Sequence, residues 1–291
     1  MADLSGKVAL ITGSGSGIGQ GTAVRLARDG ADICIADIDL DGAEKTASMV
    51  REFGRSAHIV RCNVASKEQV QSAADACVAE LGGLDVAVAN AGIGRGGSVL
   101  EMELKDWQDQ VDINLTGVFL TVQAAAQRMV EAGNGGRIVC ISSLAALSTN
   151  ELMWSYSATK AGVAMMVRGW AADLGPHGIN INAIGPGVID TPLAHALAGD
   201  DGGPIRTALE ASTPLGREGR PSDIAGLISF LVGPDADFMT GSYLLMDGGI
   251  RNAAGGRLIE DPESEIGRER ARHMQAGMDR TARLQPLIDE R

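Results

Sequence analysis

Basic residues are scarce in this sequence, which has 25 lysines and arginines against 37 aspartates and glutamates and a formal net charge of -12. A surface this acidic repels phosphate backbones and anionic membranes. The chain also lacks a run of about 18 apolar residues, the length that a helix needs to cross a bilayer. We therefore expect neither nucleic acid nor a membrane as a partner.

Cysteine is sparse as well, and the spacing of the cysteines predicts neither a disulfide framework nor a zinc site. The histidines fall into no metal-binding motif. The first seven residues lack the basic region, apolar block and cleavage site of a secretory signal. These absences predict a cytoplasmic protein with buried, reduced cysteines and no metal. The residues concerned are Cys34, Cys62, Cys77, Cys140, His58, His177, His195 and His273.

Short apolar segments alternate with longer segments of helical periodicity through most of the chain. Strands are predicted at residues 7–11, 32–36, 57–62, 84–89, 137–142, 179–184 and 242–246. Helices are predicted at residues 18–29, 40–53, 67–81, 104–131, 155–174 and 221–231. Most of the strands are apolar on both faces, which is typical of a parallel sheet covered by helices on each side. The pattern predicts an α/β fold: a single-domain, Rossmann-like, doubly wound parallel sheet of about seven strands, with ligands at the carboxyl ends of the strands.

Two regions depart from this alternation. Residues 192–220 form a connection too long for an ordinary loop, and we expect a substrate lid with a short helix inside it; a surface insertion without function is the alternative. After Gly249 the composition becomes charged, and residues 263–284 fit a helix with an apolar stripe. We expect one domain over residues 1–249 and a partly helical extension over residues 250–291. We hypothesise that the stripe docks on a neighbouring subunit, and its members are Ala271, Met274, Met278 and Ala282.

A glycine-rich segment, residues 12–19, follows the first predicted strand and leads into the first predicted helix. Glycine lets the backbone approach a ligand closely, and the free N–H groups at the start of a helix bind a pyrophosphate. The strict G-x-G-x-x-G spacing is absent, so the segment alone is also compatible with a tight turn. Asp37 ends the second predicted strand, where a carboxylate accepts hydrogen bonds from the adenosine ribose and repels a 2′-phosphate. Together these features predict NAD rather than NADP; the alternative for Asp37 is a cap on the following helix.

Tyr156 and Lys160 lie four residues apart in one predicted helix, so their side chains share a face. Free tyrosine has a pKa of about 10 and is a poor proton acceptor at neutral pH. An ammonium about 5 Å away, at an effective dielectric of about 20, favours the phenolate by roughly 3 kcal/mol, or about 2 pKa units. We therefore predict that Tyr156 is a general acid and base whose pKa Lys160 lowers.

Two further polar residues complete the predicted site. Ser143 follows the fifth predicted strand and is expected to donate a hydrogen bond to the substrate oxygen, a role for which Ser142 competes. Asn114 stands among apolar residues of a predicted helix, where a buried amide needs partners. It either holds water in a proton relay toward Lys160 or bonds only to the backbone.

These motifs, in this order, resemble those of the short-chain dehydrogenase/reductase family, and the resemblance covers residues 4–249. The motifs are Thr12-Gly13-x-x-x-Gly17-x-Gly19, Asn90-Ala91-Gly92, Asn114, Ser143, Tyr156-x-x-x-Lys160, and Pro186-Gly187 followed by Ile189 and Thr191. The resemblance implies hydride transfer between NAD(H) and a secondary alcohol or ketone by a homo-oligomer, commonly a tetramer. It implies Tyr156 as acid and base, Lys160 as pKa tuner and ribose ligand, and Ser143 as the residue that orients the substrate. Asn114 would support the proton relay.

The resemblance also implies a set of cofactor contacts. Two positions depart from the family pattern. Asn63 stands where an aspartate commonly binds adenine, and Gly185 stands where a bulkier small residue is usual, which is expected to loosen that loop. The expected cofactor-binding residues are Gly13, Ser16, Gly17, Ile18, Gly19, Asp37, Asn63, Val64, Asn90, Ala91, Gly92, Tyr156, Lys160, Pro186, Gly187, Ile189 and Thr191.

The substrate is predicted only by class. Apolar residues after the fifth strand and in the lid suggest an apolar pocket, and we expect a cyclic or otherwise bulky secondary alcohol. His195 in the lid is a further candidate for a substrate contact. The apolar residues are Leu147, Leu152, Met153, Trp154, Leu193 and Leu197.

Other functions fit parts of the sequence. Ser157 and Lys160 match the S-x-x-K pattern of acylating serine hydrolases, but the companion K-T-G motif is missing and the predicted architecture differs. A non-catalytic NAD-binding regulator of the same fold is a second alternative, against which the complete set of Asn114, Ser143, Tyr156 and Lys160 argues. An NADP-dependent ketoreductase is a third and less favoured one.

Overall fold

The computed structural model describes residues 2–149, 152–198 and 204–252 of the chain. Within these ranges, no helix is both long and apolar enough to cross a membrane. The helix predicted at residues 263–284 and its hypothesised contact with a neighbouring subunit lie outside the described residues.

Seven parallel strands form one sheet in the order β3-β2-β1-β4-β5-β6-β7. All seven predicted strands are confirmed, and no end moves by more than two residues. The sheet order reverses between β1 and β4, which is where doubly wound folds bind their ligands. The strands are β1 (Val8–Thr12), β2 (Asp32–Asp37), β3 (Ala57–Arg61), β4 (Val86–Ala89), β5 (Gly136–Ile141), β6 (Ile179–Pro186) and β7 (Tyr243–Met246).

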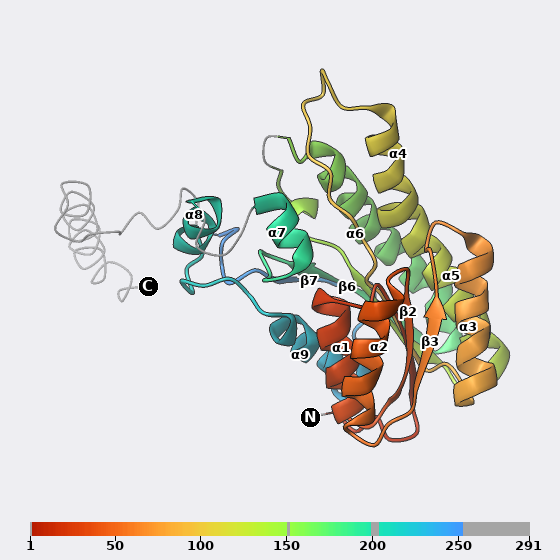
Figure 1. The fold of residues 1–291 in the computed structure, drawn as a ribbon. Coiled ribbons are helices and arrows are strands. Elements are labelled where there is room, and N and C mark those ends of the chain that lie inside the picture. The colour runs from red at the N-terminus through yellow and green to blue at the C-terminus, as the bar shows by residue number, and fades with distance from the viewer. Residues whose placement is uncertain (1, 150–151, 199–203, 253–291) are drawn as a thin grey trace, which may run out of the picture.

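Helices cover both faces of the sheet, as Figure 1 shows. One face packs against α1 (Gly17–Arg28), α2 (Leu40–Arg51) and α9 (Pro221–Val232), and the other against α3 (Lys67–Leu81), α5 (Gly117–Ala132) and α6 (Trp154–Leu174). Each face buries its own apolar cluster. This double burial explains why the strands are apolar on both sides, and it confirms the predicted α/β architecture. The four cysteines are free and buried within these layers, as expected.

Capping residues define both ends of α3. The prediction for α3 matches to the residue, because the Ser66 hydroxyl accepts a hydrogen bond from the Gln69 N–H at its start. Gly82, with a φ of 88°, ends the helix in the left-handed conformation that glycine adopts most easily.

The long helix predicted at residues 104–131 is wrong as a single α-helix. The structure has α4 (Leu104–Val111), then a π-helical turn over Asp112–Thr116, then α5. The π turn contains Asn114, whose side chain bonds to the loop after β4. Helical periodicity does not distinguish such a turn from the α-helix on either side of it.

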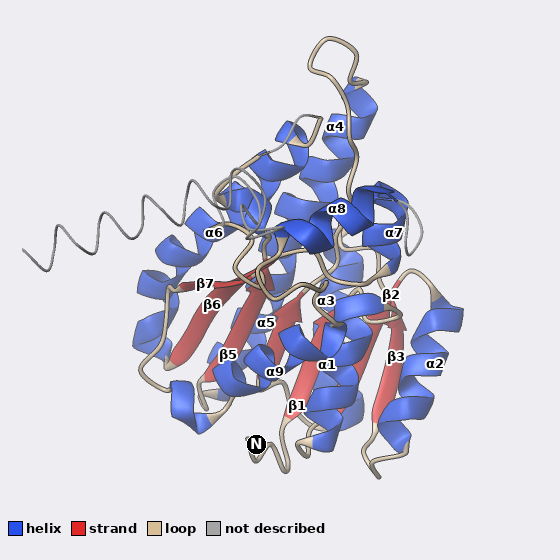
Figure 2. Ribbon diagram, turned by 90° about the vertical axis from the view of Figure 1, so that its left-hand side faces the viewer, coloured by secondary structure: helices blue, strands red, loops and turns tan. Residues whose placement is uncertain are grey.

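The predicted lid contains two short helices instead of one, α7 (Pro192–Ala198) and α8 (Pro204–Ser212). Both begin with proline, whose restricted φ suits the first position of a helix. Figure 2 shows them above the carboxyl ends of the strands. Within the lid, a buried ion pair joins Arg206 of α8 to Glu218, in the segment that leads into α9. The lid thus lies over the edge of the sheet where ligands are expected.

Candidate active site

A cavity of about 1020 Å³ lies between the carboxyl ends of the strands and the lid. All but one of the expected cofactor residues line it; the exception is Gly19, which is buried beneath the glycine loop, with its ideal Cβ position 2.6 Å from Asn90 Nδ2. Ser143 also lines the cavity, whereas Asn114 is fully buried behind it. The structure therefore brings together residues from every predicted motif.

The glycine loop allows a close approach of the backbone. Gly13 has a φ of 66°, and a Cβ atom there would lie 2.7 Å from the Cα of Ala91. The Asn90 side chain donates to the carbonyls of Thr12 and Gly13, each at 2.9 Å, and so ties the loop to the end of β4. Ser16, the N-cap of α1, makes no side-chain capping hydrogen bond among the described residues. The first N–H groups of α1 remain available to an anion, which fits a dinucleotide pyrophosphate.

Asp37 lies at the end of β2 and faces this loop. Its carboxylate accepts hydrogen bonds from the Gly15 N–H at 2.7 Å and the Asp39 N–H at 2.9 Å. Asp39, not Asp37, caps α2, so the alternative interpretation of Asp37 as a helix cap is wrong. The sequence reasoning that no arginine lies beside Asp37 holds only along the chain, because Arg61 is paired with Asp37 in the register of β2 and β3. Two acceptor oxygens in this position fit a ribose diol.

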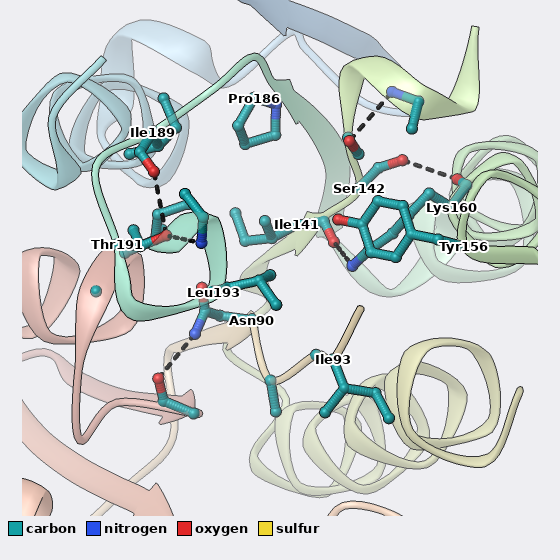
Figure 3. Close-up of a pocket in the computed structure, with 18 of the residues that line it drawn as sticks. Asn90, Ile93, Ile141, Ser142, Tyr156, Lys160, Pro186, Ile189, Thr191 and Leu193 are labelled. Atoms are coloured by element: carbon teal, nitrogen blue, oxygen red, sulfur yellow. Dashed lines mark hydrogen bonds between the residues drawn. The ribbon is translucent and has the colours of Figure 1, made fainter. Parts of the chain in front are cut away.

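Tyr156 and Lys160 face the cavity from α6, as Figure 3 shows. The Lys160 ammonium lies 5.7 Å from the centre of the Tyr156 ring and donates to the carbonyl of Ile141 at 2.9 Å. The Ser143 side chain hydrogen-bonds the Tyr156 phenol and accepts from the Ala145 N–H. One hydroxyl, one phenol and one ammonium therefore converge at the end of β5.

Burial dominates the ionisation of this group. It raises the pKa of the Tyr156 phenol, outweighing the hydrogen bond with Ser143, which lowers it. Burial also lowers the pKa of Lys160 to about 8. The prediction that Lys160 gives Tyr156 a lowered pKa is therefore wrong for the protein alone, because both groups are desolvated and the ammonium is bound to a backbone carbonyl.

The structure separates Ser142 from Ser143. The Ser142 hydroxyl is buried and donates to the carbonyl of Lys160 at 2.8 Å, so it no longer competes for the substrate oxygen. Figure 3 shows this bond beside the one that holds Lys160. Ser143 is the serine whose hydroxyl contacts Tyr156.

Asn114 bonds mainly, but not only, to the backbone. Its side chain accepts from the N–H of Ile93 and donates to the carbonyl of Ile93, both at 2.8 Å, and reaches Thr159 Oγ1 at 3.3 Å. A Cβ atom on Gly92 would lie 3.2 Å from Asn114 Oδ1 and 3.4 Å from Lys160 Nζ. Both polar groups therefore border the space beside Gly92, and the relay stays a prediction.

The substrate end of the cavity differs in part from the expected one. Met153 and Leu193 line it. Leu147 and Leu152 do not, and Trp154 instead stacks on another indole and donates to the carbonyl of Gly97. The side chain of Leu197 lies outside the described residues. Leu144 and Ala145 after the fifth strand and Leu209 in the lid line it as expected for those segments. Sequence reasoning missed Val188, Ile250 and Arg251, which line it too.

His195, named as a candidate for a substrate contact, is instead paired with Asp190. Its Nε2 lies 2.9 Å from Asp190 Oδ1, and Asp190 in turn contacts the buried Arg206. This pairing connects α7 to α8, and His195 does not line the cavity. We assign it to the lid's own contacts.

The comparison with known proteins agrees with this geometry. A family model described as enoyl-(acyl carrier protein) reductase matches residues 13–251. L-rhamnose 1-dehydrogenase (NAD(P)(+)) from Sphingomonas sp. (strain SKA58) is 40% identical over 248 residues, which cover 85% of this chain and 97% of that protein. The chain belongs to the short-chain dehydrogenase/reductase family. It is therefore an oxidoreductase.

Two further members of the family bear on the site. Cis-4-hydroxycyclohexanecarboxylate dehydrogenase from Sinomonas cyclohexanicum is 40% identical over 244 residues, covering 84% of this chain and 96% of that protein. The solved structure of carveol dehydrogenase from Mycobacterium avium in complex with NAD has a TM-score of 0.82 and 33% identity, covering 87% of this chain and 100% of that one. Both fit the single-domain architecture found here.

Gly185, a departure from the family pattern, has a structural explanation. A Cβ atom there would overlap the hydroxyl of Tyr243 and lie 2.5 Å from its Cζ. The Tyr243 hydroxyl donates a hydrogen bond to the carbonyl of Ser143. The expected loosening of the loop is therefore wrong, because the space left by the missing side chain is filled from β7.

Proposed function

We propose that this protein transfers a hydride between NAD(H) and a bulky, largely apolar secondary alcohol or ketone, with Tyr156 as the general acid and base. One observation carries the proposal: Tyr156, Ser143 and Lys160 meet at one end of a cavity whose other end holds the glycine loop and Asp37. A bound nicotinamide would accept or supply the hydride. The protein's own residues would bind, orient and exchange the proton.

Each residue has a distinct role in this proposal. In oxidation, the Tyr156 phenolate accepts the hydroxyl proton of the alcohol while Ser143 donates a hydrogen bond to the same oxygen. In reduction, the protonated phenol returns that proton to the carbonyl oxygen. Because burial raises the pKa of Tyr156, the phenolate needed for oxidation becomes more abundant as the pH rises. Oxidation should therefore be favoured at alkaline pH and reduction at neutral pH.

Residues along the cavity would hold the dinucleotide. The N-terminus of α1 and the loop at Gly13 would bind the pyrophosphate, and Asp37 would accept from the adenosine ribose. Lys160 would donate to the nicotinamide ribose, and Asn114 would support a proton relay beside it. The NAD complex of the structurally similar carveol dehydrogenase supports this cofactor. We further propose that the protein is a cytoplasmic homotetramer, with one Rossmann domain in each subunit.

Cofactor choice gives a direct test of Asp37. With wild-type protein, kcat/KM should be markedly higher for NAD than for NADP, because the carboxylate repels a 2′-phosphate. Asp37→Asn should weaken NAD binding and reduce this preference by roughly tenfold or more, about 1.4 kcal/mol. A wild-type preference for NADP would refute the assignment, and would direct attention to Arg61.

The chemistry of the cavity favours an alicyclic substrate over a polyol. One relative acts on L-rhamnose and another on cis-4-hydroxycyclohexanecarboxylate. A sugar needs hydrogen-bond partners for most of its hydroxyls, whereas the substrate end here is lined mainly by apolar side chains such as Leu144, Met153, Val188 and Leu193. We therefore propose a cyclic secondary alcohol.

The deciding experiment is a panel of secondary alcohols and ketones followed by NADH absorbance, run on wild type and Tyr156→Phe. The variant should lose turnover by about 10² to 10⁴ while it still binds cofactor. Ser157→Ala is the comparison variant, because Ser157 also lines the cavity but bonds to Thr149 and has no part in the proposed hydride transfer. NAD binding without turnover of any compound would favour the regulator, and loss of an esterase activity in Ser157→Ala would favour the hydrolase.

A further inference from the structure

One charged side chain among the described residues at the substrate end of the cavity is not committed to another role. Among the described lining residues, the charged side chains are those of Asp37, Lys160 and Arg251. Asp37 lies at the adenosine end, and Lys160 is buried and bound to the carbonyl of Ile141. Arg251 is exposed at the mouth. Among the lining residues that the structure describes, it is the one cation that a substrate can reach.

We propose that the substrate carries an anionic group, a carboxylate in the simplest case, and that the Arg251 guanidinium binds it at the cavity mouth. This rests on the proposed function, since it assigns the substrate class of the same site. The hydroxyl of the substrate lies deep, at Tyr156 and Ser143, and its anionic end lies at the surface. An apolar ring between the two matches the apolar lining.

A structured turn sets the position of Arg251. The Asp247 carboxylate accepts from the Gly249 N–H at 2.9 Å through one oxygen and from the Arg251 N–H at 3.0 Å through the other. The turn packs against the cavity wall, because a Cβ atom on Gly187 would lie 2.7 Å from the Cα of Asp247. This arrangement directs the chain back over the mouth as it leaves β7.

Most N–H donors of the Arg251 guanidinium have no partner among the residues that the structure describes. Its only hydrogen bond to another described residue runs from Nη2 to the carbonyl of Leu147 at 3.5 Å, and no described carboxylate forms an ion pair with it. A guanidinium has five N–H donors in a planar fork that matches the two oxygens of a carboxylate. One long bond therefore leaves room for a bidentate ligand.

Two electrostatic observations concern the Arg251 charge. Burial raises the pKa of Tyr243, and the Arg251 charge opposes that rise, so the guanidinium acts near the residue that holds the Ser143 carbonyl. The whole chain carries a formal net charge of -12, which repels an anionic substrate at longer range. A cation at the mouth offsets this repulsion locally.

The test compares three probes that share one ring: cis-4-hydroxycyclohexanecarboxylate, its primary amide and cis-4-methylcyclohexanol, each with NAD. Wild type should have a kcat/KM for the carboxylate at least about tenfold above that for the amide. Arg251→Met should bring this ratio close to one through KM, with kcat/KM for the methyl compound retained. Arg251→Lys should keep part of the preference, since it keeps the charge but loses the fork.

Arg168→Met is the matched control, because it removes the same charge from an exposed arginine of α6 that does not line the cavity. A ratio of kcat/KM for carboxylate to amide that is near one in wild type, or unchanged in Arg251→Met, would overturn the inference. Turnover of the neutral alcohols would still support the proposed function. If no probe is oxidised, the proposed function fails for this ring. The inference is then decided by binding: the affinities of cyclohexanecarboxylate and cyclohexanecarboxamide are compared for the NADH-loaded wild type and for Arg251→Met. Tighter binding of the carboxylate by wild type, lost in Arg251→Met, supports the inference. Equal binding of the two compounds by wild type refutes it.

Discussion

Replacing Gly185 by alanine tests whether Gly185 and Tyr243 are a matched pair. The two residues lie on adjacent parallel strands, where Gly185 pairs with Leu245 and Tyr243 pairs with Ala183. The added Cβ would overlap the Tyr243 hydroxyl, and would lie 2.5 Å from Cζ and 2.9 Å from Cε1. The ring must therefore move, and its hydrogen bond to the Ser143 carbonyl must break.

The cost has two parts. Overfilling a packed site costs about 1 to 3 kcal/mol, and losing a hydrogen bond costs about 0.5 to 1.5 kcal/mol. The Ser143 carbonyl keeps a second bond, from the Ala146 N–H at 2.9 Å, so the loss is not that of an unsatisfied buried group. Gly185→Ala should lower the free energy of unfolding by about 1.5 to 4.5 kcal/mol, or Tm by roughly 3 to 18 °C. Because Ser143 shifts, kcat should fall as well.

A double-mutant cycle separates the clash from other effects. Tyr243→Phe removes only the hydroxyl and should cost about 0.5 to 1.5 kcal/mol. Tyr243→Val removes the ring, and in that background Gly185→Ala should be neutral or stabilising by up to about 1 kcal/mol, because alanine suits a strand better than glycine. Urea unfolding and kcat are measured for each variant. An equal cost of Gly185→Ala in both backgrounds would show that Tyr243 does not occupy this space.

Two further predictions concern buried charges. The pKa of Lys160 falls from 10.5 in the unfolded chain to about 8 on folding, so the unfolded state binds more protons between these values and stability rises with pH there. Between pH 8 and 10.5, the unfolding free energy of wild type should rise by roughly 3 kcal/mol relative to that of Lys160→Met, as measured by urea titrations. A difference between the two proteins that stays constant with pH would contradict this prediction. Glu218→Gln leaves the buried Arg206 without its main carboxylate partner, and should cost about 3 kcal/mol and raise the KM of the alcohol as the lid loosens. A thermal shift equivalent to less than about 1 kcal/mol would show that the pair does not hold the lid.

The sequence by itself determined the architecture and which of its motifs meet at the site. The alternation of apolar and helical segments predicted seven strands and their covering helices, because backbone periodicity depends on near neighbours in the chain. Tyr156 and Lys160 were predictable together because one helical turn separates them. The glycine loop and Asp37 were predictable because each directly follows or ends a strand, and parallel strands bring such ends to one edge of a sheet.

Only the tertiary structure decided how deeply these groups are buried, and which residues from distant parts of the chain lie beside them. The pKa of Tyr156 rises because packing desolvates it, and no local spacing reports burial. Tyr243 fills the space at Gly185, and Arg251 reaches the cavity mouth, because β7 lies beside β6 in the folded sheet. Contacts between residues far apart in the chain depend on how the layers pack, and a single sequence carries no direct signal of that packing.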